Sequence, residues 1–374
     1  MIIKSDKKEW LLRYMISDSP RQTALQRITA DHDFLPKNSC FFSSAACCVA
    51  AALSMSTGDE KLLRDNLSAL GYSEIITIAF RNTERDKVGM CIASRIRENR
   101  LQIAAVLRDT NGSEWYSNFD VGYSAEHSGF AKAADFAELK LGDYVFTHAI
   151  GMEPEFFLTG YSRGGAVANI LAKRLCDRYG LERVCAYTFA SPSTTLSRHT
   201  NRYNCIYNLV RQEDLFTRVP PEGWGYTKYG KNISLSDAGD ISARYRQLTG
   251  EDYIGFTRQG AVDRFIGAVY DLAPNVNAYY RRRREVGDRK LSLYELMTSV
   301  AHMLSQNKDD AAEEIFLSAM MSDYADLLSF LSSGADLNDL IASANALPRC
   351  SVAGSHSPAA YMAALDAVIG CSAG

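Results

Sequence analysis

Gly160-Tyr161-Ser162-Arg163-Gly164 is the stretch that decides the fold, because a chain with this pattern turns sharply from a strand into a helix. Residues 155–159 before it form an apolar run typical of a buried strand, and residues 164–172 after it favour a helix. A G-x-S-x-G pattern in this context predicts a nucleophile elbow, with the serine at the apex of the turn. The glycines leave the room that a serine with positive φ requires.

A tight turn without chemistry would also fit these residues, but the flanking strand and helix favour a functional serine. A helix that begins just after Ser162 points its unpaired N–H groups at the place where an oxyanion would form. The backbone N–H of Arg163, the residue after the serine, is therefore a candidate donor to that oxyanion. Ser162 is the candidate nucleophile.

The segments around this motif alternate between strand-like and helix-like patterns. We expect strands at 75–80, 88–94, 101–107, 156–159, 184–189 and 206–210, and helices at 38–58, 130–141, 166–178 and 358–369. The first three strands predict an antiparallel meander that leads into a mainly parallel sheet. This order is typical of an α/β fold with helices on both faces of a central sheet.

Two further regions flank this core. Residues 1–70 are expected to form an N-terminal helical region, because Trp10, Leu11, Leu12 and Tyr14 group as if on one helix face. Residues 71–374 then form a single domain. Within it the strand signal fades after about residue 235, and helical periodicity predicts an insertion at about 235–345.

Composition excludes several classes of protein. A net charge of -3, with 47% hydrophobic and 23% charged residues, is typical of a soluble globular protein and gives no nucleic-acid signature. The nine cysteines show no zinc-binding spacing, so we expect no metal, and a reducing compartment is the simpler interpretation. We recognise neither a signal peptide nor a membrane span, and the expected location is cytoplasmic. Oligomeric state is not predicted.

A serine hydroxyl becomes an effective nucleophile when a histidine removes its proton and a carboxylate orients that histidine. Three histidines follow Ser162 in the chain, at 199, 302 and 356. His356 lies on a Gly/Ser loop just before Pro358, which suits the first turn of a helix. His199 and His302 fit surface or packed side chains better. We therefore expect His356 to be the base.

Asp214 is the candidate carboxylate. It follows the strand at 206–210, and catalytic residues of open α/β sheets gather at the carboxyl ends of their strands. A turn carboxylate would fit the same position. The order Ser162, Asp214, His356 is the chain order of the triad in α/β-hydrolases.

Together these residues resemble the class 3 (fungal-type) triacylglycerol lipases and their bacterial lipase-like relatives. The resemblance covers about 75–235 and again 350–365. Its blocks are 106–111 with Trp115 and Asn118, 127–130, 158–169, 187–192, 208–214, 219–221, and His356 with Tyr361. No single block decides the resemblance, but together, in the order of the family, these blocks are specific.

The resemblance implies an α/β-hydrolase fold and a carboxylic ester hydrolase, a lipase or esterase that forms an acyl-enzyme on Ser162 with Asp214 and His356. It also implies that Thr110 joins Arg163 in the oxyanion hole. It implies a small-molecule or lipid ester substrate, transient contact with a membrane or lipid interface, no nucleic acid and no cofactor. The insertion would form a cap, for which the aromatic candidates are Trp224, Tyr226, Tyr229, Phe256 and Phe265.

Two positions depart from the family pattern. Asp109 stands where the family usually has glycine, and its carboxylate would oppose an oxyanion unless Arg108 or another cation holds it aside. Tyr161 replaces the more usual histidine before the serine. Two alternatives stay open: an amidase or peptidase on the same triad, and a catalytically weak hydrolase fold used as a binding or scaffold module. Asp109 is the residue that favours the second.

Overall fold

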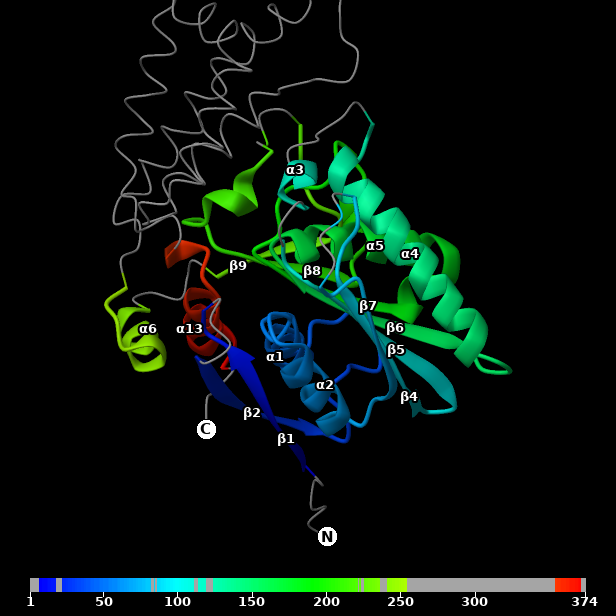
Figure 1. The fold of residues 1–374 in the computed structure, drawn as a ribbon, viewed down its shortest axis with the longest axis horizontal. Coiled ribbons are helices and arrows are strands. Elements are labelled where there is room, and N and C mark those ends of the chain that lie inside the picture. Colours follow the sequence, from blue (N-terminus) through cyan, green and yellow to red (C-terminus); the bar gives the residue numbers. More distant parts are fainter. Residues whose placement is uncertain are drawn as a thin grey trace, which may run out of the picture.

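The computed structural model describes residues 7–17, 22–81, 84, 86–110, 114–118, 124–220, 222, 225–235, 241–253 and 354–370. A seven-stranded sheet is formed by β3 (Ser73–Ile78), β4 (Met90–Arg97), β5 (Arg100–Leu107), β6 (Pro154–Tyr161), β7 (Val184–Phe189), β8 (Ile206–Val210) and β9 (Lys231–Ser234). The strands lie side by side in that order (Figure 1). β3, β4 and β5 pair antiparallel, and all later pairs are parallel. The predicted meander and mainly parallel α/β sheet are confirmed.

Helices cover both faces of this sheet (Figure 1). One face carries α4 (Ser128–His148) and α5 (Arg163–Tyr179), and the other carries α1 (Ser44–Ser54), α2 (Glu60–Ala69) and α13 (Pro358–Ile369). Side chains of a strand alternate between faces. Phe156 and Leu158 of β6 accordingly pack with α4 and α5, while Phe157 and Tyr161 pack with α1 and α13.

The N-terminal region differs from the prediction. Residues 7–31 form an antiparallel ribbon, β1 (Lys7–Met15) and β2 (Thr23–Asp31), and helices begin only at α1. Leu12 and Tyr14 are fully buried, whereas Leu11 and Arg13 are exposed, Leu11 at 47%. This alternation has the period of a strand, so the expected helical region is wrong for its first half.

The uncharged run at 38–58 contains α1, as predicted. Ser43 caps the helix by accepting the backbone N–H of Ala46 at 3.2 Å, and residues 46–54 are buried throughout. Cys47 is a buried free thiol, whereas Cys48 is disulfide-bonded. In the part of the chain that the structure describes, no helix is both long enough and apolar enough to span a membrane.

The predicted insertion at about 235–345 lies mostly outside the described residues. Its first part contains α6 (Ser242–Thr249), which packs against α13. Trp224, Phe256 and Phe265 also lie outside the described residues. Tyr226 and Tyr229 are both buried, and the hydroxyl of Tyr229 donates to Glu126 at 3.0 Å. Tyr229 belongs to the core beside α5 and provides no surface for a cap.

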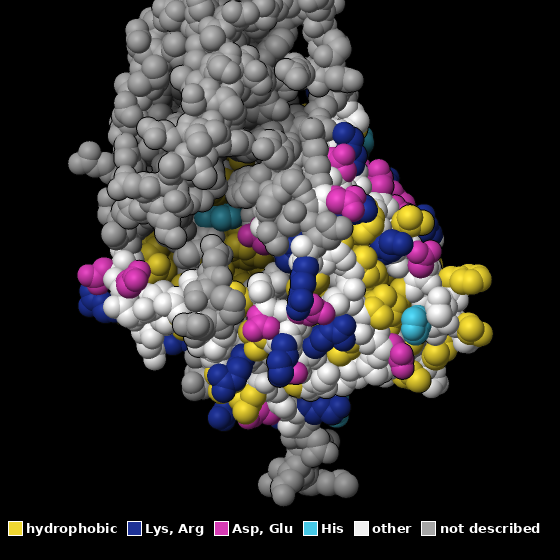
Figure 2. Space-filling view, viewed as in Figure 1, with side chains coloured by type: hydrophobic (Ala, Val, Ile, Leu, Met, Phe, Trp, Pro, Cys, Tyr) yellow, Lys and Arg dark blue, Asp and Glu magenta, His cyan; other side chains and the backbone are white. Residues whose placement is uncertain are grey.

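The described surface mixes charges of both signs. Figure 2 shows Lys and Arg side chains interspersed with Asp and Glu, and hydrophobic side chains gathered over the region of α4. The most exposed large apolar residues there are Phe146, at 87%, and Ile150, at 80%.

Candidate active site

Ser162 stands at a sharp turn between β6 and α5. Its backbone has φ 52° and ψ −120°, a left-handed conformation that is strained for a serine. The backbone N–H of Ser162 donates to Phe189 O of β7 at 2.9 Å, which fixes the turn to the sheet. Ser162 is also the residue that precedes the first helical residue, Arg163. The predicted nucleophile elbow therefore has the expected backbone geometry.

Glycines make this turn possible. A Cβ atom at Gly160 would lie 2.3 Å from the backbone of Gly164, and one at Gly164 would lie 2.3 Å from Leu107 O. Real Cβ atoms do not approach backbone this closely. The absence of these two side chains lets α5 start directly against the end of β5.

The three residues expected to act together do meet. His356 Nε2 lies 3.0 Å from Ser162 Oγ, and His356 Nδ1 lies 2.8 Å from Asp214 Oδ2. The Asp214 side chain is fully buried, whereas the His356 side chain is 17% exposed. A neutral imidazole that carries its proton on Nδ1 would donate to Asp214 and accept from Ser162.

The carboxylate of Asp214 is held from two sides. Oδ1 accepts the backbone N–H of Phe216 at 3.0 Å, within the 3-10 helix Leu215–Arg218. Oδ2 accepts the hydroxyl of Tyr361 at 2.7 Å. Burial raises the pKa of Tyr361 well above its usual value, so this hydroxyl keeps its proton and remains a donor. Asp214 therefore has one orientation, turned toward His356.

His356 is positioned by the start of α13. Ser357 caps this helix by accepting the backbone N–H of Ala360 at 3.2 Å, and Pro358 occupies the first turn, as predicted. The hydroxyl of Tyr161 donates to the carbonyl oxygen of His356. The ring of Phe216 packs 4.5 Å from the imidazole, centroid to centroid. Tyr161, which differs from the family pattern, thus holds the backbone of the candidate base.

Thr110 and Arg163, the two residues expected around an oxyanion, are joined through one side chain. The Asn118 amide nitrogen donates to Thr110 Oγ1 at 3.0 Å, and Asn118 Oδ1 accepts from Arg163 at 2.7 Å. The backbone N–H of Thr110, however, donates to Asp109 Oδ1 at 2.6 Å. The carboxylate of Asp109, which departs from the family pattern, therefore already accepts a hydrogen bond from one of the N–H groups expected to bind the oxyanion.

Arg108 does not hold that carboxylate through any hydrogen bond in the described residues. Its guanidinium donates to the backbone carbonyl of Asp109 at 2.8 Å and to Glu114 Oε1 at 2.7 Å. Glu114 is fully buried and also lies 4.0 Å from Arg163 Nε. Burial lowers the pKa of Arg163 to about 10, while Glu114 and Asp109 oppose that shift, so Arg163 stays charged at neutral pH. Nothing in the sequence singled out Glu114.

The remaining candidates lie elsewhere. His199 is exposed on a loop, and His302 lies outside the described residues.

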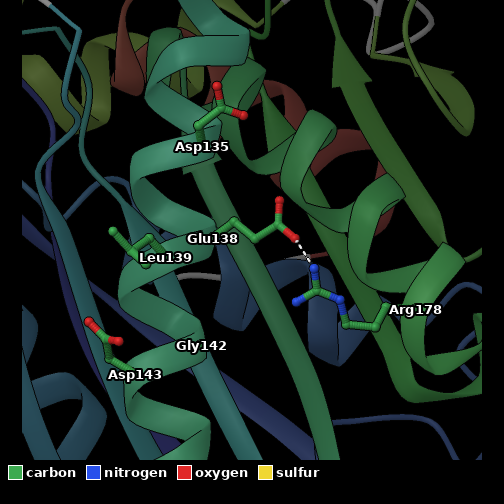
Figure 3. Close-up of a pocket in the computed structure, with 6 residues that line it drawn as sticks. All are labelled: Asp135, Glu138, Leu139, Gly142, Asp143 and Arg178. Atoms are coloured by element: carbon green, nitrogen blue, oxygen red, sulfur yellow. Dashed lines mark hydrogen bonds and ion pairs between the residues drawn. The ribbon is translucent and has the colours of Figure 1, made fainter.

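A surface hollow of about 430 Å³ lies along α4 and is lined by Asp135, Glu138, Leu139, Gly142, Asp143 and Arg178. Figure 3 shows Glu138 and Arg178 pointing toward each other, joined by an ion pair of 2.6 Å. None of the candidate catalytic residues lines this hollow. Within the described ranges, no cluster of three or more potential ligands could hold a metal ion.

The family comparison bears directly on this site. Residues 100–224 match the class 3 lipase family. The matched segment includes Ser162, Asp214, Thr110 and Arg163, and His356 lies beyond its end. The match confirms the predicted resemblance and supports the predicted activity, carboxylic ester hydrolysis by a serine hydrolase of the lipase type. It also agrees with the α/β-hydrolase fold class.

Solved lipase structures resemble the chain distantly. A triacylglycerol lipase whose catalytic centre is described as a serine protease triad is 20% identical over 52% of this chain and 78% of its own, with a TM-score of 0.40. The Rhizomucor miehei triacylglyceride lipase is 19% identical over 51% and 79%, with a TM-score of 0.39. A lipase from Rhizopus microsporus var. chinensis is 17% identical over 51% and 71%, with a TM-score of 0.39. No curated protein sequence matches the chain.

Proposed function

We propose that this protein hydrolyses the carboxylic esters of lipids through an acyl-enzyme on Ser162, with His356 as general base and Asp214 as the residue that orients it. The continuous hydrogen-bond chain from Ser162 Oγ through His356 to Asp214, 3.0 and 2.8 Å long, carries the proposal. Ser162 and His356 are both partly accessible, while Asp214 is not. A substrate can therefore reach the nucleophile and the base, but not the acid.

In the first half of the reaction, Ser162 Oγ attacks the ester carbonyl while His356 Nε2 takes its proton. The imidazolium that results is stabilised by Asp214 through Nδ1. The oxyanion of the tetrahedral intermediate accepts from the backbone N–H of Arg163 and, once Asp109 has moved, from Thr110. Each donor of this kind contributes roughly 3 to 4 kcal/mol to the transition state.

Once the tetrahedral intermediate has formed, His356 changes from base to acid. His356 gives its proton to the leaving alcohol, which departs and leaves the acyl group on Ser162. Water then enters, loses a proton to His356 and attacks the acyl carbonyl. Ser162 is released with its proton restored, and the products are a carboxylic acid and an alcohol. Every proton in this cycle moves through His356 Nε2, so the proposed mechanism requires no cofactor.

The class 3 lipase match favours lipid esters as the substrate class. Contact with a lipid interface is part of the proposal, because such esters are presented in aggregates. Rates measured with one ester below and above its critical aggregation concentration test this point. A rate that simply saturates, with no rise at aggregation, would argue for dispersed substrates.

One observation favours a second candidate function. The hydrogen bond from Thr110 N–H to Asp109 weakens the oxyanion hole, as in a hydrolase fold that serves for binding or as a scaffold. A fluorophosphonate probe separates the two, because it labels Ser162 if the serine is activated. A protein that stays unlabelled although its fold is intact would support the scaffold.

Hydrolysis of p-nitrophenyl esters from acetate to palmitate tests the main proposal. We expect turnover by the native protein and by Ser68→Ala, a matched control at an exposed serine on α2. We expect loss of at least about 10³-fold in Ser162→Ala, which retains only residual catalysis. Equal rates in native protein and Ser162→Ala would refute an acyl-enzyme at this residue.

A further inference from the structure

Lys228 is a buried cation close to the candidate active site that the mechanism above does not use. It lies just before β9, and only 5% of its surface is exposed. Buried lysines need a partner that justifies the cost of removing an ammonium group from water.

Its ammonium group reaches the segment that carries Asp214. Lys228 Nζ donates to the carbonyl oxygen of Thr217 at 2.7 Å. Thr217 in turn donates to the carbonyl oxygen of Asp214, from Oγ1 at 2.8 Å and from its backbone N–H at 3.2 Å. Lys228 thus contacts the C-terminal end of the short 3-10 helix Leu215–Arg218. The Asp214 carboxylate caps the N-terminal end of the same helix.

The charges around Lys228 also point to this role. Asp214 and Glu222 are the charged groups whose electrostatic influence reaches it among the described residues, and both favour its protonated form. Burial outweighs them and lowers the pKa of Lys228 to about 8. Its charge is therefore present at neutral pH and is lost in mildly alkaline solution. Asp214 is the same carboxylate that accepts from His356 and Tyr361.

We propose that Lys228 is a positioning residue for the pair of His356 and Asp214, acting through the backbone of the 3-10 helix and through its positive charge. The hydrogen bond to Thr217 keeps Asp214 turned toward His356. The charge offsets part of the field of Asp214 at the imidazole, so that His356 loses its proton at a lower pH than it would beside Asp214 alone. This inference rests on the proposed function, because it concerns the same site.

Two variants test Lys228: one removes its hydrogen bond and its charge together, and the other keeps both but does not titrate in the alkaline range. Lys228→Met removes both and keeps the length of the side chain, whereas Lys228→Arg keeps a donor and a charge that is not lost in the alkaline range. Lys231→Met, at an exposed lysine on β9, is the matched control. The measurement is kcat and KM for a dispersed p-nitrophenyl ester between pH 5 and pH 10, with circular dichroism as the check of folding.

We expect Lys228→Met to lower kcat by about tenfold with KM within about threefold, because orientation and not binding is lost. The acid limb of its kcat/KM profile should move to higher pH, a shift that a merely structural lysine would not produce. Native protein should show a change in rate near pH 8 that Lys228→Arg lacks. A folded Lys228→Met with native kcat and an unmoved acid limb would overturn the proposal.

A second measurement does not depend on turnover. The ring resonances of His356, followed by NMR in the native protein, should move once as the imidazole titrates and again near pH 8 as Lys228 loses its charge. A single transition would count against the proposal, and this holds even if neither variant folds. If the native protein cleaves no ester at all, the proposed function fails, but the NMR titration still decides the role of Lys228.

Discussion

The carboxylate of Asp109 accepts the backbone N–H of Thr110 at 2.6 Å. This N–H group is one of the two that we propose as donors to the oxyanion. A substrate carbonyl must therefore compete with a carboxylate that is already in place and negatively charged. The proposed nucleophile and base are in position, yet one proposed oxyanion donor is engaged before substrate arrives.

Replacement of Asp109 should raise activity. In Asp109→Ala the Thr110 N–H is released and the negative charge beside the oxyanion is gone, so we expect kcat/KM to rise by about tenfold, equivalent to ~1.4 kcal/mol. Asp109→Asn is the control, because it removes the charge but keeps an acceptor, and its gain should be smaller. A lower kcat/KM in Asp109→Ala, at unchanged thermal stability, would show that the carboxylate assists catalysis.

The close contact at Gly164 predicts a stability effect. A methyl group there would lie 2.3 Å from Leu107 O, so Gly164→Ala should destabilise the fold by at least ~2 kcal/mol and abolish turnover. Gly142→Ala on α4 is the matched control. A Cβ there meets nothing within 4 Å, and alanine should stabilise the helix by ~0.5 to 1 kcal/mol. Urea denaturation of both variants measures the difference, and equal midpoints would contradict the expected strain.

The hydroxyl of Tyr361 should matter for rate more than for fold. Tyr361→Phe removes a hydrogen bond to a charged group, a contribution of roughly 1.5 to 3 kcal/mol, and leaves Asp214 less firmly oriented. It also removes the oxygen that accepts the backbone N–H of Arg211 at 3.3 Å. We expect kcat to fall by about tenfold with little change in KM. Tyr253→Phe removes a hydroxyl that donates to Glu213 and serves as the comparison. Indistinguishable rates for the two variants would mean that Asp214 needs no help from Tyr361.

Lys228 also predicts how stability depends on pH. Its pKa is about 8 in the folded protein and near the ordinary value for lysine in the unfolded chain. Below pH 8 both states bind the proton, so the cost of burying the charge is fully present. Between pH 8 and about 10 the unfolded state binds more protons, and the free energy of unfolding should rise, by roughly 2 to 3 kcal/mol at most.

Guanidinium unfolding at pH 7, 8, 9 and 10 measures this rise. Lys228→Met lacks the titrating group, so the difference in unfolding free energy between native protein and this variant should change over the same pH range. A constant difference would show that Lys228 titrates outside it.

The sheet and its helices could be predicted because each element there is a continuous apolar run between polar turns. The runs at 184–189 and 206–210 became β7 and β8 with the bounds expected. The ribbon of β1 and β2 could not be predicted. Trp10, Leu11 and Leu12 are consecutive apolar residues, and they hide the alternation that buries only every second residue of β1. Lys8 and Arg13 add charges at positions that suit either periodicity.

For the site, residue types and chain order were enough to select Ser162, Asp214 and His356, because few histidines follow the serine. Their supporting contacts could not be predicted in the same way. Lys228 reaches Thr217 and Glu114 reaches Arg108 only through tertiary packing, and neither residue carries a local motif. The sequence indicated that the charge of Asp109 would oppose an oxyanion. It did not predict that Asp109 accepts a hydrogen bond from Thr110.

The burial of α13 against α1 links the N-terminal residues to the position of His356. Residues 359–365 share one hydrophobic cluster with Leu12, Tyr14 and the whole inner side of α1. His356 lies just before α13, so this helix, which packs against the ribbon of β1 and β2 and against α1, positions the imidazole. We therefore expect a protein without its first seventy residues to keep Ser162 but to lose the position of His356, its proposed base.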